Sequence, residues 1–89
     1  MMITISFEIP EYDDGIEVFW DENAKLKVQS FDNEALICAN KQALLSLAKQ
    51  LIYLAVNDIS EGSHVHYDDF FCKGGFLGDN ELIIEKMND

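Results

Sequence analysis

Both histidines of the chain lie in one short segment, at positions 64 and 66, and Asp68 follows them at the same spacing. Residues two positions apart on a β-strand share one face, so His64, His66 and Asp68 would line one side of a strand at steps of about 6.5–7 Å. His-x-His is a common spacing of metal ligands, and aspartate adds an oxygen ligand. These three residues are therefore the candidate ligands if the chain binds a metal ion.

The rest of the sequence argues against a metal site. Asp69 stands where the His-x-His-x-Asp-His element of metallo-hydrolases has its last histidine, and the chain has no third histidine. A catalytic zinc needs a further ligand and supporting residues that orient the ligands. We expect no metal and no cofactor, and we expect this strand to belong to a structural hydrogen-bond network or to a binding surface.

The serines and cysteines show no sign of a nucleophile. No serine lies in a Gly-x-Ser-x-Gly setting, and neither Cys38 nor Cys72 is part of a catalytic or CxxC motif. Ser63 and His64 are adjacent only in sequence, and neighbours on a strand point to opposite faces. We expect no catalytic residue and no enzyme activity, and we expect both cysteines to be reduced.

The charge of the chain narrows the choice of partners. Seventeen acidic residues against six basic ones, all lysines, give a formal charge of −11. Nucleic-acid phosphates and anionic membrane surfaces attract basic patches, so neither is an expected partner. The charge either keeps the protein soluble or accelerates its association with a basic partner.

Residues 8–22 hold seven acidic residues and no basic one, with aromatic side chains between them. Such a segment is either a solvated rim or an acidic patch with aromatic anchors for a basic protein. The candidate partner-binding residues combine this segment with the histidine strand: Glu11, Tyr12, Asp13, Asp14, Glu17, Phe19, Asp21, Glu22, His64, His66 and Asp68.

Alternating and helical patterns predict the elements that would position these residues. Strands are expected over 3–9, 16–20, 25–29, 35–39, 64–68 and 82–86, with a turn at Asp13-Asp14-Gly15 and a glycine-rich turn over 73–80. Asn40 is the expected N-cap of a helix over 41–57, although a helix starting near Asp32 or Asn33 is an alternative. The helix is expected to bury an apolar stripe: Leu44, Leu47, Ala48, Leu51, Leu54 and Ala55.

This order, β-β-β-β-α-β-β, predicts an α+β two-layer sandwich, with one long helix packed on one face of a mostly antiparallel sheet. A chain of 89 residues predicts a single domain over 1–89. It shows neither a signal peptide nor an apolar run of about 18 residues, so a cytoplasmic location is expected.

Three segments in sequence order carry a resemblance to a known family. They are a leucine-rich helix over 44–55, a Gly-x-His-x-His-x-Asp strand over 62–70, and a Glu-Leu-Ile-Ile-Glu closing strand over 81–86. Together they resemble the immunity protein 32 family of bacterial polymorphic toxin systems over about residues 34–87. Within this resemblance Gly62, His64, His66 and Asp68 match the family motif. The chain departs from the family in lacking Gly-Ser immediately before the closing strand.

The resemblance implies a cytoplasmic, non-catalytic protein, encoded beside a secreted toxin, that neutralises the toxin by stoichiometric binding. The charge would then predict a basic toxin bound through an acidic surface. Two alternatives remain open: a metal-binding or metal-sensing module built on the His-x-His-x-Asp strand, and an interaction module that forms a homodimer through an exposed strand edge.

Overall fold

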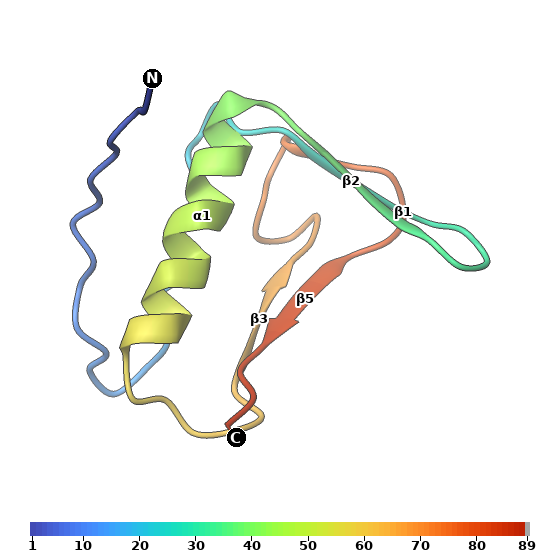
Figure 1. The fold of residues 1–89 in the computed structure, drawn as a ribbon. Coiled ribbons are helices and arrows are strands. Elements are labelled where there is room, and N and C mark those ends of the chain that lie inside the picture. Colours follow the sequence, from blue (N-terminus) through green and yellow to red (C-terminus); the bar gives the residue numbers. More distant parts are fainter. Residues whose placement is uncertain (89) are drawn as a thin grey trace.

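The structure is a computed structural model in which residues 1–88 are described. Its elements follow the order β-β-α-β-β-β (Figure 1). Their bounds are β1 Leu26–Ser30, β2 Ala35–Ala39, α1 Lys41–Val56, β3 His64–Tyr67, β4 Phe76–Leu77 and β5 Leu82–Glu85. The strands form two small sheets, one ordered β2-β1-β4 and the other β3-β5. The general α+β prediction is confirmed, whereas the predicted order β-β-β-β-α-β-β and the single sheet are wrong.

The helix α1 begins and ends where local chemistry favours it. The side-chain oxygen of Asn40 accepts a hydrogen bond from the backbone N–H of Ala43 over 3.0 Å, which satisfies an otherwise unpaired group of the first turn. At the other end the Lys86 ammonium donates to the carbonyl of Leu54 over 2.6 Å, which stabilises the negative end of the helix dipole. The predicted helix over 41–57 is confirmed to within one residue, and the alternative start near Asp32 is wrong.

The side of α1 that faces the core differs in part from the predicted stripe. Leu47 and Leu54 are buried as expected, but Leu44 and Leu51 are more than half exposed. The helix is apolar around much of its circumference, so its pattern does not determine which side is covered. The buried positions of the helix are Ala43, Leu47, Gln50, Tyr53 and Leu54.

The core lies between α1, β1 and the inner face of the β3-β5 sheet. Val65 and Tyr67 are buried in it, while the alternate residues His64 and His66 face outward, as the pattern predicts. The ring of Trp20 packs at 5.7 Å from the ring of Tyr67, measured between centroids. A second, smaller cluster of Tyr53, Leu54 and Ile59 lies towards the C-terminal end of α1.

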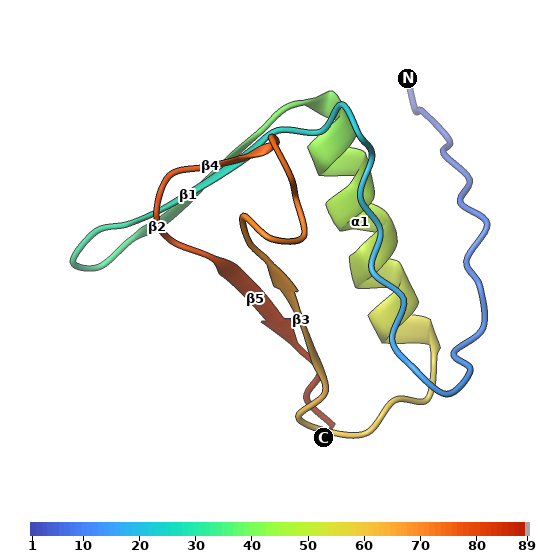
Figure 2. The same ribbon diagram turned by 180° about the vertical axis from the view of Figure 1, so that it is seen from behind.

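The two N-terminal strands predicted over 3–9 and 16–20 do not form in the structure. Residues 1–6 are exposed, and residues 16–20 run across α1 as irregular chain (Figure 2). Gln50 of α1 supplies the hydrogen bonds that a strand partner would have made, since it accepts from the N–H of Phe19 and donates to the carbonyl of Glu17, each over 3.0 Å. Only the predicted turn is present, with Asp14 at a φ of 61°.

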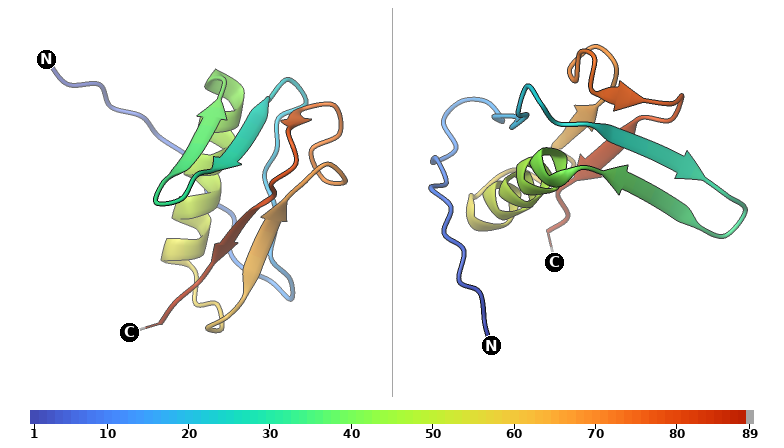
Figure 3. Two further views of the ribbon diagram at one scale, coloured as in Figure 1. Left: turned by 90° about the vertical axis from the view of Figure 1, so that its right-hand side faces the viewer. Right: turned by 90° about the horizontal axis from the view of Figure 1, so that it is seen from above.

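The glycine-rich segment predicted as a turn contains the short strand β4, which pairs with β1 in parallel. Leu26 lies opposite Phe76, and the N–H of Leu26 donates to the carbonyl of Gly75 over 2.7 Å. A Cβ atom on Gly75 would collide with the carbonyl oxygen of Ala24, so this close approach of two backbones requires glycine. The parallel pairing and the split into two sheets (Figure 3) correct the prediction of one mostly antiparallel sheet.

Candidate functional site

The two histidines lie on the outer face of the β3-β5 sheet, and each has a carboxylate of the neighbouring segment beside it. The Nδ1 atom of His66 is 3.3 Å from Oε2 of Glu81, and Nδ1 of His64 is 3.9 Å from Oε1 of Glu85. The two imidazole centroids are 4.8 Å apart. All four side chains are about half exposed, and such exposed pairs contribute little to stability.

The structure groups the possible metal ligands differently from the sequence pattern. Ligand atoms of His66, Asp68 and Glu81 lie within 4.8 Å of one another, whereas Nδ1 of His64 is 3.0 Å from the carbonyl of Gly62. Three ligands on an exposed surface are fewer than the four of a closed structural zinc site. Asp68 is also engaged elsewhere, because its Oδ1 atom accepts from the N–H of Phe71 over 2.8 Å.

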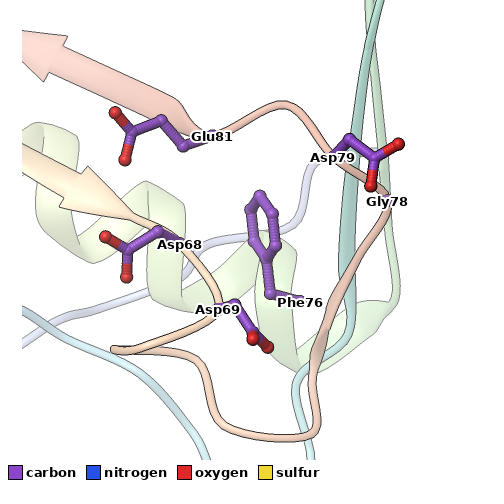
Figure 4. Close-up of a pocket in the computed structure, with 6 residues that line it drawn as sticks. All are labelled: Asp68, Asp69, Phe76, Gly78, Asp79 and Glu81. Atoms are coloured by element: carbon purple, nitrogen blue, oxygen red, sulfur yellow. The ribbon is translucent and has the colours of Figure 1, made fainter.

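Next to this cluster the surface has a hollow with a volume of about 600 Å³, here called the acidic hollow (Figure 4). Four carboxylates surround the half-buried ring of Phe76, and none of the lining residues is basic. In Figure 4 the side chains of Asp68 and Glu81 lie on one side of that ring and Asp79 on the other. The lining residues are Asp68, Asp69, Phe76, Gly78, Asp79 and Glu81.

Three separate segments build the acidic hollow. Asp68 and Asp69 follow the end of β3, where the carbonyl of Asp68 accepts a hydrogen bond from the N–H of Cys72 over 2.8 Å. Phe76 is held by the pairing of β4 with β1, and Glu81 immediately precedes β5. Four like charges around one hollow repel each other and attract a cation, and an aromatic ring among them offers its face to the same cation.

The candidate residues of the N-terminal segment are spread along α1 and do not form one hairpin. Tyr12 lies at the C-terminal end of the helix, where its N–H donates to Oδ1 of Asn57 over 2.8 Å. Asp21 lies towards the N-terminal end, where its N–H donates to Oγ of Ser46 over 3.2 Å. The acidic side chains of this segment are exposed: Glu11, Asp13, Asp14, Glu17, Asp21 and Glu22.

The side chain of Phe19 packs against residues of α1. Its ring meets the ring of Tyr53 edge to face at 5.3 Å, and the ammonium of Lys49 lies 4.6 Å from its centroid. The structure therefore places Phe19 against α1, apart from the histidine strand and the acidic hollow.

Five residues of the acidic hollow were not among the candidates predicted from the sequence, because they come from segments that only the fold brings together. The available signal was the clustering of acids around the glycine-rich loop, with an acidic pair at its start and two further acids at its end. The five residues are Asp69, Phe76, Gly78, Asp79 and Glu81.

Comparison with known proteins adds one match. The sequence model of a protein family described as Immunity protein 32 matches residues 34–87. No curated protein and no solved structure matches the chain. The matched range includes α1, both histidines and every residue that lines the acidic hollow, and it leaves out the acidic N-terminal segment.

Proposed function

The chain belongs to the immunity protein 32 family, and on this premise we propose that it neutralises a cognate bacterial toxin by binding it stoichiometrically. An immunity protein of this kind acts by occupying its toxin, so it needs a complementary surface and no catalytic group. We further propose that this binding takes place in the cytoplasm. In residues 1–88 no helix has the length and apolar character needed to span a bilayer.

The observation that carries the choice of surface is the acidic hollow, with its four carboxylates and no basic lining residue. A guanidinium or ammonium group of a basic toxin would enter it and donate charge-assisted hydrogen bonds to several carboxylates. The volume of about 600 Å³ lies within the usual range of binding pockets, about 300–1,000 Å³. The net charge of −11 would steer a basic toxin towards the protein from a distance.

The exposed part of the N-terminal segment supplies a second contact in this proposal. The exposed residues Glu11, Asp13 and Asp14 flank Tyr12 in the sequence, and Tyr12 is 40% exposed. This combination resembles the charged rim and aromatic anchor of protein interfaces. Because this segment lies outside the family match, we propose that it contributes specificity for one toxin.

The experiment is calorimetric titration of the co-encoded toxin with two double variants. Asp69→Asn with Asp79→Asn removes two charges from the acidic hollow, and Asp32→Asn with Asp58→Asn removes two exposed charges elsewhere. We expect one-to-one binding, a loss of affinity of about tenfold or more for the first variant, and a change of less than about threefold for the second.

Two results would contradict the proposal at different levels. No binding between the wild-type chain and the co-encoded toxin at micromolar concentration would exclude the immunity function. Normal binding by the variant of the acidic hollow would keep the function and move the interface to another surface.

A metal-binding role is the second candidate, and one observation favours a particular ligand set for it. The ligand atoms of His66, Asp68 and Glu81 are within 4.8 Å of one another, and two of these residues also line the acidic hollow. A bound divalent cation would compete there with a cationic side chain of the toxin, so zinc titration separates the two roles.

A further inference from the structure

The helix α1 has a second apolar side that the rest of the chain leaves open. Five large side chains on it are between 36% and 66% exposed, and at 3.6 residues per turn they fall within an arc of about 140°. We call this surface the α1 apolar face. Its residues are Leu44, Leu45, Leu51, Ile52 and Val56.

The figures show why this face is open. Residues 12–22 cross α1 on the side seen from behind (Figure 2), and the core lies beside it. From the front no other described segment crosses the helix (Figure 1). The exposed apolar area is on the order of 500 Å², near the upper end of the range of about 300–600 Å² for the largest patch of a typical monomer.

The strand β2 next to the helix extends this surface. It is the edge strand of the β2-β1-β4 sheet, and Leu36 and Ile37 on its two faces are 42% and 46% exposed. Edge strands usually carry a charged residue, a proline or a bulge that prevents pairing with another chain. The sequence of β2, Ala-Leu-Ile-Cys-Ala, has neither a charge nor a proline. Viewed from above, β2 lies on the side of its sheet away from β4 (Figure 3, right).

The distribution of charge indicates which partner fits. None of the 17 acidic residues lies between positions 35 and 57, the stretch that contains β2 and α1. Its only charged residues are Lys41 and Lys49, and the ammonium of Lys49 is turned to the ring of Phe19. A basic toxin would find no carboxylate on this stretch. Two copies of this acidic chain would meet here without bringing their acidic side chains together, so charge repulsion is smallest at this surface.

We propose that the α1 apolar face is the contact between two copies of this chain, related by a two-fold axis, with the β2 edge beside it. A two-fold contact requires a surface that is complementary to itself, and an apolar helix face meets this requirement. A standard interface buries about 800 Å² per partner, so the proposed contact would include the β2 edge and a polar rim as well as the α1 apolar face. The contact is separate from the acidic hollow, so a dimer would present two toxin sites.

The test is the molar mass of the purified protein in solution, measured by sedimentation equilibrium without toxin. The wild-type chain is expected at twice the monomer mass of 10.1 kDa at micromolar concentration. Salt should strengthen the dimer, since it screens the repulsion between two chains of charge −11. Salt would weaken the binding of a basic toxin, so the two associations are distinguishable.

Leu51→Glu is the test variant and Ile83→Glu is its matched control. The two positions are 52% and 49% exposed, but Ile83 lies on β5, away from the α1 apolar face. Leu51→Glu should raise the dimer dissociation constant by about thirtyfold or more, as for a central interface residue, and Ile83→Glu should leave it within about threefold. Leu44→Glu provides a second variant on the same face, and circular dichroism verifies that each variant is folded.

A wild-type chain that is monomeric at high micromolar concentration and raised salt overturns the proposal. A dimer that survives both Leu51→Glu and Leu44→Glu also overturns it, because the contact would then lie elsewhere.

Discussion

Replacing Gln50 by leucine tests whether this side chain, in place of a strand partner, holds the N-terminal segment. Gln50 is completely buried in the middle of α1. Its Oε1 atom accepts from the N–H of Phe19 and the hydroxyl of Tyr67, each over 3.0 Å, and its Nε2 atom donates to the carbonyl of Glu17, also over 3.0 Å. Leucine fills a similar volume but forms none of these bonds.

The expected cost follows from the groups that lose their partners. The N–H of Phe19 and the carbonyl of Glu17 would be left without these bonds, and an unsatisfied buried group costs about 1–3 kcal/mol. The Tyr67 hydroxyl keeps an alternative acceptor in the Phe19 carbonyl at 3.2 Å. Because the two backbone groups are only partly buried, we expect Gln50→Leu to lower the free energy of unfolding by about 2–3 kcal/mol. For a domain of this size that lowers the melting temperature by about 10–20 °C.

The assay is urea unfolding followed by circular dichroism, with Gln42→Leu as control. Gln42 is a half-buried glutamine in the first turn of the same helix, and its replacement should change stability by less than about 0.5 kcal/mol. Amide hydrogen exchange gives a local readout, since the N–H of Phe19 should lose protection in Gln50→Leu. If both variants lose less than about 1 kcal/mol and Phe19 stays protected, this network does not hold the segment.

Three further outcomes are expected. Asn40→Ala should cost about 2 kcal/mol in urea unfolding, because the amide both caps α1 and bonds to the N–H of Lys25 over 2.9 Å, and Asn40→Asp should recover part of the loss. Burial raises the pKa of the Cys72 thiol from 9.0 to about 11. The stability that depends on the neutral thiol should therefore be complete below pH 9 and lost as the pH rises through 11. In Cys72→Ala this loss of stability at alkaline pH should be missing from unfolding curves measured as a function of pH. Excess zinc should leave the melting temperature unchanged. The metal site would be demonstrated by a rise in melting temperature that is abolished in His66→Ala and Glu81→Gln but kept in His64→Ala.

The elements that depend on local chemistry were predictable from the sequence. Asn40 marks the start of α1, and the alternation of Val65 and Tyr67 with the histidines marks β3 and its buried face. The family resemblance over residues 34–87 was also readable, since it rests on the order of such elements.

The N-terminal segment shows where alternation alone misleads. A period of two indicates extended chain with two different sides, but it does not name the hydrogen-bond partner. Here the partner of residues 17–19 is the side chain of Gln50, a polar residue that a helical pattern would place on the surface. Gln50 and Tyr53 occupy the inner side of the helix, so Leu44 and Leu51 lie on the other side and are exposed.

The candidate site was only partly predictable for a related reason. His66 and Asp68 were found because their spacing within one strand is regular. Glu81 and Asp79 join them through the pairing of β3 with β5 and of β4 with β1, which no local pattern specifies. The predicted partner-binding role of these surfaces stays a prediction until a toxin is bound.

The parallel pairing of β1 with β4 has a consequence for synthesis of the protein on the ribosome. Leu26 pairs with Phe76 and Lys27 with Leu77, so most of the chain separates the two halves of this contact. A growing chain therefore carries the β1-β2 hairpin with an open edge on both sides until residue 77 has left the ribosome. Such late, non-local pairing slows folding and exposes the nascent chain to aggregation. Translation speed and chaperone supply, as well as final stability, are then expected to set how soon functional protein accumulates.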